Sequence, residues 1–390
     1  MYPETFEFAT AGRIIFGCGK VKELPELLKP FGKKVLLVTG AHPERHEKLK
    51  RLIEEAGLGV EFQSVREEPT VERVNEITEY IQRRQCDAVV GIGGGSVLDA
   101  GKAAAALANN PGELMDYLEG VGKGKALPCP SLPYIAVPTT AGTGSEVTKN
   151  AVIGVPEASV KVSFRSAYLL PKIALVDPEL TLDSPPEVAV NCAFDALSHL
   201  LEAYLSLKAT PMTDAVCREG LSRLGGGVLM AYWMKPEHLA SRVHVSLASL
   251  LGGLALANGG LGAVHGFAGV LGGMIGAPHG AICASILAPV LKMNYSVARE
   301  NPTKESQRLL GRISEVSLML SRNVGARPED AIEIIERLAR SQNVAKLGKL
   351  GLKKEQFPTV VEKASKASSM KGNPFVLSAE KLTQILEEAF

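Results

Sequence analysis

The first half of the chain alternates short apolar runs with longer amphipathic ones. The runs with the length and composition of buried strands are 34–39, 60–65, 88–92 and 134–137. Apolar residues recur at helical spacing over 44–56, 71–84 and 97–108. Strands that alternate with helices indicate a parallel sheet covered on both faces, so this half predicts an α/β domain. The opening run FEFATAGRIIFG, residues 6–17, predicts a hairpin at the sheet edge.

The pattern changes after Leu175-Val176-Asp177-Pro178 and is helical almost to the end of the chain, with many Ala and Leu residues. Pro185-Pro186 is a natural boundary, because proline restricts the residue before it and interrupts regular structure. The fold class predicted is therefore α/β, with a Rossmann-like parallel-sheet domain at 1–185 followed by an all-α helical domain at 186–390.

No Asp, Glu, Lys or Arg occurs between Arg242 and Lys292, a stretch long enough to cross a membrane. It nevertheless contains three histidines, Asn258 and eleven glycines, and no aromatic belt flanks it. A helix that is apolar on all sides can also lie in the core of a large domain. We interpret the stretch as core, and expect no membrane partner.

Composition narrows the class of protein further. The 390 residues carry a formal charge of +1 and are 46% apolar, which suits a globular protein of two domains and lacks the basic face that nucleic-acid binding requires. The six cysteines include no C-x-x-C pair, and the N-terminus has no signal-peptide pattern. A cytoplasmic location is therefore expected.

Two loops follow predicted strands and have the composition of a phosphate-binding site. In CDAVVGIGGGS, residues 86–96, glycines let the backbone approach a ligand and point the first amides of the next helix at an anion. The loop lacks the G-x-G-x-x-G spacing, so alone it also fits a tight turn without a ligand. A second loop, PTTAGTGSE at 138–146, offers four hydroxyls at another strand end, where α/β sheets bind ligands.

A candidate metal site lies in the helical half. Asp195 and His199 stand at i and i+4, so a helix projects them from one face. His265 and His279 lie in the uncharged stretch, each followed by glycine. One carboxylate and three imidazoles suit iron(II) or zinc with a position left open for substrate, although each residue could also serve as an ordinary core histidine, helix cap or ion-pair partner.

Five motifs, in order, carry a resemblance to a known family: GGGSVLDAGK, PTTAGTGSEVT, LVDPEL, DALSHLLEAY and VHGFAGVLGGMIGAPHG. The chain resembles the iron-containing (group III) alcohol dehydrogenases from its N-terminal part to its last helix. The resemblance implies a dinucleotide-binding domain, a helical domain with one Fe2+ or Zn2+ ion, the architecture of dehydroquinate synthase, and a homodimer.

The resemblance also implies site residues. Asp195, His199, His265 and His279 fall on the metal ligands of the family, and so act in catalysis through the metal. The pyrophosphate loop of the family corresponds to Gly94, Gly95 and Ser96. Positions that line the cofactor correspond to Thr139, Thr140, Thr148 and Lys161.

Three positions depart from the family pattern. The resemblance implies that family members preferring NAD have an aspartate at the end of the first strand, near the adenosine ribose. Here that position is Gly40, followed by His42, Arg45 and His46. Without a carboxylate to repel a 2′-phosphate, NADP(H) is predicted to be favoured over NAD(H). Gly269 stands where many members have a second histidine with a suspected proton-relay role, so protons must move through water or the cofactor ribose. VNCAFDAL replaces the usual Thr-Gly before the aspartate, and nothing in the sequence explains its effect.

These observations predict a metal-dependent oxidoreductase that transfers a hydride between a small primary alcohol or aldehyde and the nicotinamide, with the metal acting as Lewis acid. The alternatives within the fold are a zinc glycerol or diol dehydrogenase and a maleylacetate-type reductase. A lyase related to dehydroquinate synthase is disfavoured, because a phosphorylated, carboxylated substrate would need several basic residues and 243–291 has none. A non-catalytic metal- or nucleotide-binding protein is disfavoured by the complete set of four ligands.

Overall fold

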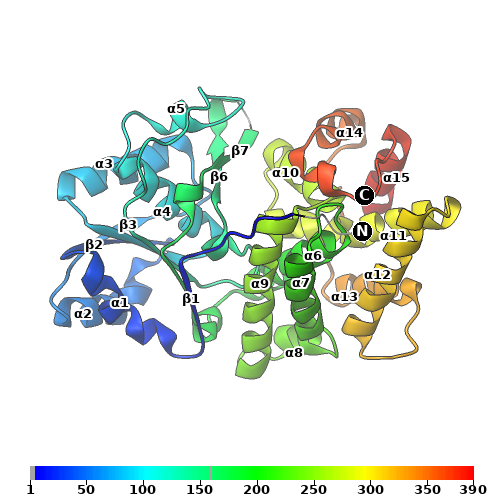
Figure 1. Ribbon diagram of the computed structural model, residues 1–390, viewed down its shortest axis with the longest axis horizontal. Helices are drawn as coiled ribbons and strands as arrows, with labels where there is room; N and C mark the ends of the chain where they lie inside the picture. Colours follow the sequence, from blue (N-terminus) through cyan, green and yellow to red (C-terminus); the bar gives the residue numbers. More distant parts are fainter. Residues whose placement is uncertain (1–4, 159) are drawn as a thin grey trace. The chain divides into compact units, whose positions relative to one another are not determined.

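The parallel sheet predicted for the first half of the chain is present in the computed structural model, which describes residues 5–158 and 160–390. Within these residues the sheet runs in the order β1-β8-β5-β4-β2-β3, and every neighbouring pair is parallel (Figure 1). Its strands are β1 Arg13–Phe16, β2 Lys34–Thr39, β3 Gly59–Ser64, β4 Ala88–Gly93, β5 Tyr134–Pro138 and β8 Ile173–Val176.

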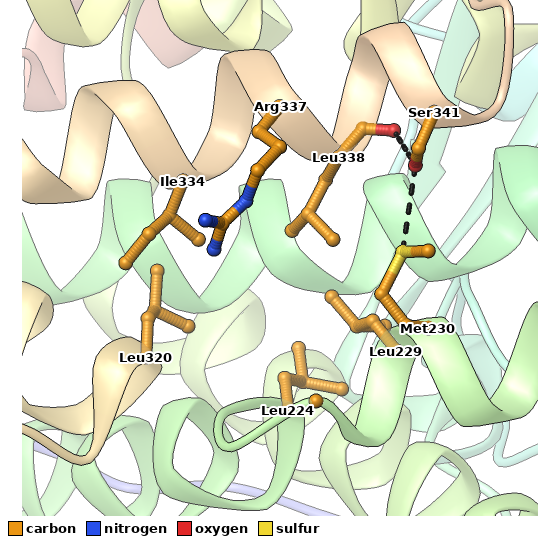
Figure 2. Close-up of a pocket in the computed structure, with 9 residues that line it drawn as sticks. Leu224, Leu229, Met230, Leu320, Ile334, Arg337, Leu338 and Ser341 are labelled. Atoms are coloured by element: carbon orange, nitrogen blue, oxygen red, sulfur yellow. Dashed lines mark hydrogen bonds between the residues drawn. The ribbon is translucent and has the colours of Figure 1, made fainter.

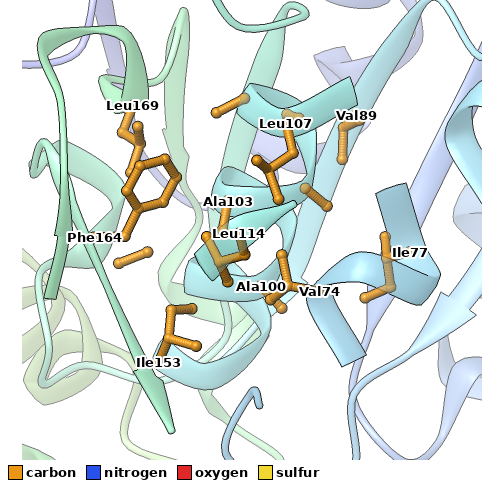
Figure 3. Close-up of a cluster of buried hydrophobic side chains, with 14 of the residues drawn as sticks. Val74, Ile77, Val89, Ala100, Ala103, Leu107, Leu114, Ile153, Phe164 and Leu169 are labelled. Carbon is orange, nitrogen blue, oxygen red and sulfur yellow. The ribbon is translucent and has the colours of Figure 1, made fainter. Parts of the chain in front are cut away.

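Alternate residues of the central strands point to opposite faces, and both faces are buried. On one face Leu36 and Val89 join the apolar sides of α3 (Val71–Arg84) and α4 (Gly95–Ala108), as Figure 3 shows for Val74, Ile77 and Leu107. On the other face Val35 and Leu37 pack against α1 (Leu24–Leu28) and α2 (Glu47–Glu55). Because both faces are covered, the strands read as continuous apolar runs instead of alternating ones.

The order of the strands creates a switch point beside β2. The chain leaves β2 through α2 to reach β3 on one side, and then crosses through α3 to reach β4 on the other side of β2. Crossovers that diverge in this way leave an opening at the carboxyl ends of β2 and β4, where α/β sheets bind ligands. Gly40 follows β2 and Gly94 follows β4, so both flank this opening.

The predicted edge hairpin at 6–17 is wrong. Among the described residues of this run only Arg13–Phe16 forms a strand, and it pairs in parallel with β8. The sequence analysis also missed a separate antiparallel pair, β6 (Asn150–Val155) and β7 (Val160–Arg165), between the second loop and β8. Local alternation could not identify the partner of β1, because that partner lies about 160 residues further along the chain.

The rest of the chain from Pro185 is helical and forms one unit with residues 5–9, whereas the other unit is formed by 10–184. We call these the helical unit and the α/β unit. A short α5 (Leu114–Tyr117) lies in the α/β unit. The helices of the helical unit are α6 Pro186–Leu205, α7 Pro211–Leu224, α8 Val228–Met234, α9 Leu239–Gly259, α10 Ala263–Ile275, α11 His279–Glu300, α12 Lys304–Ser321, α13 Pro328–Ser341, α14 Phe357–Ser365 and α15 Ala379–Ala389. The fold class predicted from sequence, a parallel-sheet domain followed by a helical one, is confirmed.

Two helices of the uncharged stretch are long and apolar enough to cross a membrane by composition, namely α9 and α11. Inside the helical unit 61% of the apolar window of α9 and 67% of that of α11 are buried. Burial of this extent is typical of core helices in a large domain, which supports the core interpretation.

Candidate functional site

Helix α6 presents three ionisable side chains on one face. Asp195 and His199 are one turn apart, and Glu202 is three residues beyond His199, so helical periodicity places them in a row. All three are at least 95% buried. Burying charged groups is costly unless they are paired or bind a cation, so this row is a strong candidate for a functional site.

Two further helices bring imidazoles to the same place, and all the elements involved belong to the helical unit. His265 lies in the first turn of α10, and His279 is the first residue of α11. The Oδ1 atom of Asp195 lies 3.4 Å from Nε2 of His265, 3.6 Å from Nε2 of His279 and 3.7 Å from Nε2 of His199. We call these four residues the Asp195 cluster. Donors bound at about 2.0–2.2 Å to one tetrahedral ion are separated by about 3.3–3.6 Å, so this spacing fits a shared metal.

A second observation tests whether the cluster suits a cation. The Oδ1 atom of Asp195 is buried and has no hydrogen-bond partner among the described residues. An orphaned buried carboxylate oxygen is costly, and a divalent ion among the three ring nitrogens would satisfy it. The donors present therefore fit a metal ion.

Glu202 fixes the orientation of one of these rings. Its Oε2 atom accepts a hydrogen bond from Nδ1 of His265 at 2.7 Å, which leaves Nε2 facing Asp195. The same carboxylate accepts from the backbone amides of Val264 (2.6 Å) and His265 (3.3 Å), at the start of α10. Asn373 accepts from the amide of Ala263 at 3.3 Å. The first turn of α10 is thus capped from outside, and its positive dipole end faces a carboxylate.

Glycines explain how the helices come this close. A Cβ atom at Gly280, next to His279, would lie 2.4 Å from the carbonyl oxygen of Asn191 in α6. A Cβ at Gly266, next to His265, would lie 2.8 Å from the terminal methyl of Met370. On α9, a Cβ at Gly252 would lie 3.3 Å from Cβ of His199. The glycine after His279 thus permits the close packing of α11 on α6 that positions the ring, whereas the methionine end near Gly266 could move aside.

The electrostatics of the cluster favour positive charge. Burial alone would lower the pKa of His265, but the Cys283 sulfur and the carboxylates of Asp195 and Glu202 raise it well above its ordinary value. Burial opposes ionisation of Asp195, yet the surrounding imidazoles lower its pKa below the usual range. Such a field attracts a cation when one is available. His279 is the most open donor, with 41% of its side chain exposed.

In the α/β unit the two predicted loops lie side by side. Gly94 precedes α4 with no side chain capping the helix, and Gly95 and Ser96 form its first turn. A Cβ at Gly94 would lie 3.5 Å from the side chain of Thr140, and one at Gly95 would lie 2.7 Å from that of Thr143. The amide of Thr139 donates to the carbonyl of Gly93 at 2.9 Å. The structure therefore brings together the predicted residues of both loops at the ends of β4 and β5.

The second loop is anchored by a buried cluster that the sequence analysis did not identify. The Nζ atom of Lys102 donates to the carbonyl and hydroxyl of Ser145 (2.7 and 3.0 Å), the hydroxyl of Thr148 (3.1 Å) and the carbonyl of Asn150 (2.8 Å). Asp99 accepts from Ser145 Oγ at 2.6 Å. We call Asp99, Lys102, Ser145 and Thr148 the Lys102 cluster. Because the hydroxyl of Thr148 is engaged within this cluster, Thr148 holds the loop in place.

The other two predicted cofactor residues lie apart from these loops in sequence. Gly40 directly follows β2, and a Cβ there would meet no atom within 4 Å. Lys161 lies on β7, and its amine forms an ion pair with Glu68. Gly269, the position without the second histidine, is exposed, and a Cβ added to it would likewise contact nothing within 4 Å.

Helical spacing held a signal for two residues that the sequence analysis missed. Glu202 follows His199 by three residues, and Cys283 follows His279 by four, so each shares a helix face with a predicted ligand. Lys102 occurs inside the motif GGGSVLDAGK but has no local feature that distinguishes a buried lysine from an exposed one.

A separate apolar pocket of about 200 Å³ lies elsewhere in the helical unit, among α8, α12 and α13 (Figure 2). Leucines and Met230 line it, with Arg337 at its wall and Ser341 donating to Leu338. It contains none of the predicted site residues and no acid–base pair, so it does not compete with the Asp195 cluster as a catalytic site.

Comparison with known proteins identifies the family. The sequence profile described as iron-containing alcohol dehydrogenase matches residues 11–178, and the profile for the C-terminal part of the Fe-containing alcohol dehydrogenase family matches residues 189–390. The NAD-dependent methanol dehydrogenase of Bacillus methanolicus is 33% identical over 382 residues, which cover 96% of this chain and 97% of that protein.

Two further similarities cover nearly the whole chain. The 1,3-propanediol dehydrogenase of Klebsiella pneumoniae is 33% identical over 398 residues, with 99% of each chain covered. The crystal structure of a 1,3-propanediol oxidoreductase superposes with a TM-score of 0.90 at 31% identity, over 99% of this chain and 100% of that one.

Proposed function

Since the chain belongs to the iron-containing alcohol dehydrogenase family and is an oxidoreductase of that type, we propose that it transfers a hydride between a small primary alcohol or aldehyde and a nicotinamide dinucleotide at a divalent metal centre. One observation carries the proposal: three imidazole nitrogens lie within 3.4–3.7 Å of a single buried carboxylate oxygen that lacks a hydrogen-bond partner among the described residues. Asp195, His199, His265 and His279 would hold the ion.

The chemistry of this site follows from the donors and their surroundings. A bound divalent ion supplies a Lewis acid that polarises the oxygen of the substrate. Asp195 supplies the anionic donor, Glu202 keeps Nε2 of His265 directed at it, and the apolar helices around them exclude water. The exposed side of His279 leaves room for a small substrate to enter.

Gly94, Gly95 and Ser96 would bind the cofactor pyrophosphate through backbone amides at the start of α4, and Thr139 and Thr140 would line the adjacent loop. Thr148 would act by holding that loop, and Lys161 by contacting the cofactor from β7. The Lys102 cluster would support the arrangement through the second loop.

We propose that NADP(H) is favoured over NAD(H). The open space at Gly40 supports this, since position 40 carries no carboxylate and a Cβ there would meet no atom within 4 Å. Burial lowers the pKa of His46, and Arg45 lowers it further, so His46 is neutral at pH 7. His42 pairs with Glu44 at 2.9 Å. The positive charge of this loop therefore rests on Arg45.

The cofactor proposal is tested by comparing kcat/KM for NADP(H) and NAD(H) in the wild type, in Gly40→Asp and in Arg45→Gln. We expect both variants to lower the NADP/NAD ratio, by about tenfold for Gly40→Asp because a carboxylate would face the phosphate. A wild-type preference for NAD(H) would show the proposal to be wrong without affecting the assignment of the reaction.

The reaction itself is tested on protein purified without oxygen, by metal analysis and by cofactor-linked turnover of a panel that includes primary alcohols, their aldehydes, glycerol and 1,3-diols. We expect one ion per chain and activity toward short primary alcohols. His265→Ala should abolish both, whereas the control His244→Ala, on α9 and outside the cluster, should retain both. Selective turnover of glycerol or diols would instead favour the diol dehydrogenase alternative.

The oligomeric state and the cellular location remain predictions. The homodimer implied by family resemblance can be checked by analytical ultracentrifugation. The cytoplasmic location expected from the cysteine pattern can be checked by cell fractionation.

A further inference from the structure

A cysteine lies beside the Asp195 cluster on the same helix as one of its histidines. Helix α11 begins at His279, and Cys283 follows one turn later on the same face. Its side chain is fully buried, and Sγ lies 3.9 Å from Nε2 of His265. One ligand atom each from Asp195, His265, His279 and Cys283 lies within 4.8 Å of all the others. The sulfur therefore belongs to the same compact group as the oxygen and nitrogen donors.

An independent observation shows that this space is prepared for a ligand. The Oδ1 atom of Asp195 points into the group, is buried, and has no hydrogen-bond partner among the described residues. Nδ1 of His265 is already engaged by Glu202, so only its Nε2 can meet the sulfur and the carboxylate. Acceptor atoms from three elements thus face one small buried volume.

We propose that Cys283 is a sulfur donor to the metal centre and that it biases the centre toward Zn2+ or Co2+ and away from Fe2+. This inference rests on the proposed function, because it concerns the ion of that same site. A thiolate is a soft ligand that favours zinc over harder ions, whereas carboxylates and imidazoles alone discriminate less. On binding, the thiol loses its proton to solvent as the bond from sulfur to the metal forms.

The distances permit this bond with little movement. Zinc binds sulfur at about 2.3 Å and nitrogen at about 2.0–2.1 Å, which separates the two donors by about 3.5–3.6 Å in a tetrahedral site. The 3.9 Å between Sγ and Nε2 of His265 exceeds this by only a few tenths of an ångström. His199 lies beside the group with its ring stacked on that of His265, at 4.5 Å between centroids. Nε2 of His199 lies 3.7 Å from Oδ1 of Asp195.

Cobalt(II) reports sulfur ligation directly. Metal-free protein is reconstituted with Co2+ under anaerobic conditions, and its absorption spectrum is recorded for the wild type, Cys283→Ala, Cys283→Ser and the control Cys217→Ala. Cys217 is a fully buried cysteine of α7 in the same unit, outside the metal group. We expect the sulfur-to-cobalt charge-transfer band in the wild type and in Cys217→Ala, and its loss in both Cys283 variants while the d–d bands of bound cobalt persist.

The outcomes separate the inference from the function on which it rests. Wild-type protein that binds Co2+ and shows d–d bands without a charge-transfer band overturns the role of Cys283 but leaves the metal centre intact. Wild-type protein that binds no Co2+ overturns the proposed function as well. The wild-type spectrum decides between these results even if a Cys283 variant fails to fold.

A competition experiment tests the selectivity. Metal-free protein is equilibrated with equal concentrations of Zn2+ and Fe2+, and the bound metals are measured. Most protein sites prefer Zn2+ to Fe2+, so the informative quantity is the change in the bound Zn/Fe ratio on substitution. We expect Cys283→Ala to lower the ratio by about tenfold and Cys217→Ala to leave it unchanged. An unchanged ratio in Cys283→Ala would overturn the selectivity.

Discussion

The two units each bury a group of charged side chains, but they satisfy those charges in different ways. In the Lys102 cluster the ammonium is 1% exposed and donates four hydrogen bonds to oxygens of Ser145, Thr148 and Asn150, at and just after the second loop, while Asp99 lies 3.8 Å away. In the Asp195 cluster a carboxylate oxygen equally deep in the protein has no hydrogen-bond partner among the described residues.

This difference indicates what each cluster is for. A buried charge whose hydrogen bonds are complete contributes to folding and holds neighbouring segments in place. A buried charged atom without a hydrogen-bond partner lowers the stability of the metal-free fold. It is tolerated where a ligand supplies the missing interaction. The comparison predicts that substitutions in the Lys102 cluster reduce stability, whereas substitutions in the Asp195 cluster reduce metal binding and activity.

The largest effect is expected in the Asp195 cluster. Asp195→Asn keeps the shape of the side chain but removes the anionic donor. We expect loss of the bound metal and a fall in kcat/KM of about 10³-fold or more. Thermal unfolding of the metal-free protein should change much less than activity, because Oδ1 of Asp195 makes no hydrogen bond among the described residues that the substitution would remove. Retention of stoichiometric metal would contradict the comparison.

The converse experiment is Lys102→Met, which leaves four acceptor atoms of Ser145, Thr148 and Asn150 without their donor. We expect the α/β unit to lose about 3 kcal/mol of unfolding free energy, measured by denaturant titration, while metal content stays unchanged. The matched control is Lys123→Met. Lys123 pairs with Asp116 at the surface with 70% of its side chain exposed, so its loss should cost far less unfolding free energy than that of Lys102. Equal costs for the two variants would refute the structural role of Lys102.

A smaller effect is expected at Glu202, which combines features of both clusters because it caps α10 and orients His265. Glu202→Gln should weaken metal affinity by about 10–100-fold, measured by competition with a chelator, because the hydrogen bond that directs the imidazole is lost or reversed. Glu187→Gln, at an exposed position in the first turn of the same helix, is the control and should not change the affinity. An unaltered affinity in Glu202→Gln would mean that packing alone positions the ring.

The last prediction concerns the pH dependence of stability. Burial raises the pKa of Glu146, beside the Lys102 cluster, from an ordinary value of 4.5 to about 7. The folded state therefore binds this proton more tightly than the unfolded state. The resulting stability is complete below pH 4.5 and is lost as pH rises through 7. Glu146→Gln should flatten this part of the stability profile, by at most about 3 kcal/mol, in denaturant titrations at a series of pH values. Parallel profiles for variant and wild type would contradict the assignment.

The interpretation of sequence pattern succeeded where local spacing carries the information. The strands 34–39, 88–92 and 134–137 and the helix 71–84 were found because buried parallel strands and amphipathic helices have distinct periods. It failed for β1, whose partner β8 is distant in sequence, and for the pair β6 and β7. The i and i+4 spacing indicated Asp195 with His199, but the same rule was not extended from His279 to Cys283.

The sequence by itself determined the two kinds of unit, the glycine and hydroxyl loops, and the four residues that family resemblance assigns to a metal. These depend on residue type and on spacing within a few turns, which a linear chain records. Only the tertiary structure decided that Oδ1 of Asp195 is left without a partner among the described residues, that Glu202 orients His265, and that Lys102 is satisfied inside the fold. Whether a buried charged group forms all its hydrogen bonds depends on atoms contributed by segments distant along the chain. Those atoms meet only when the segments pack together.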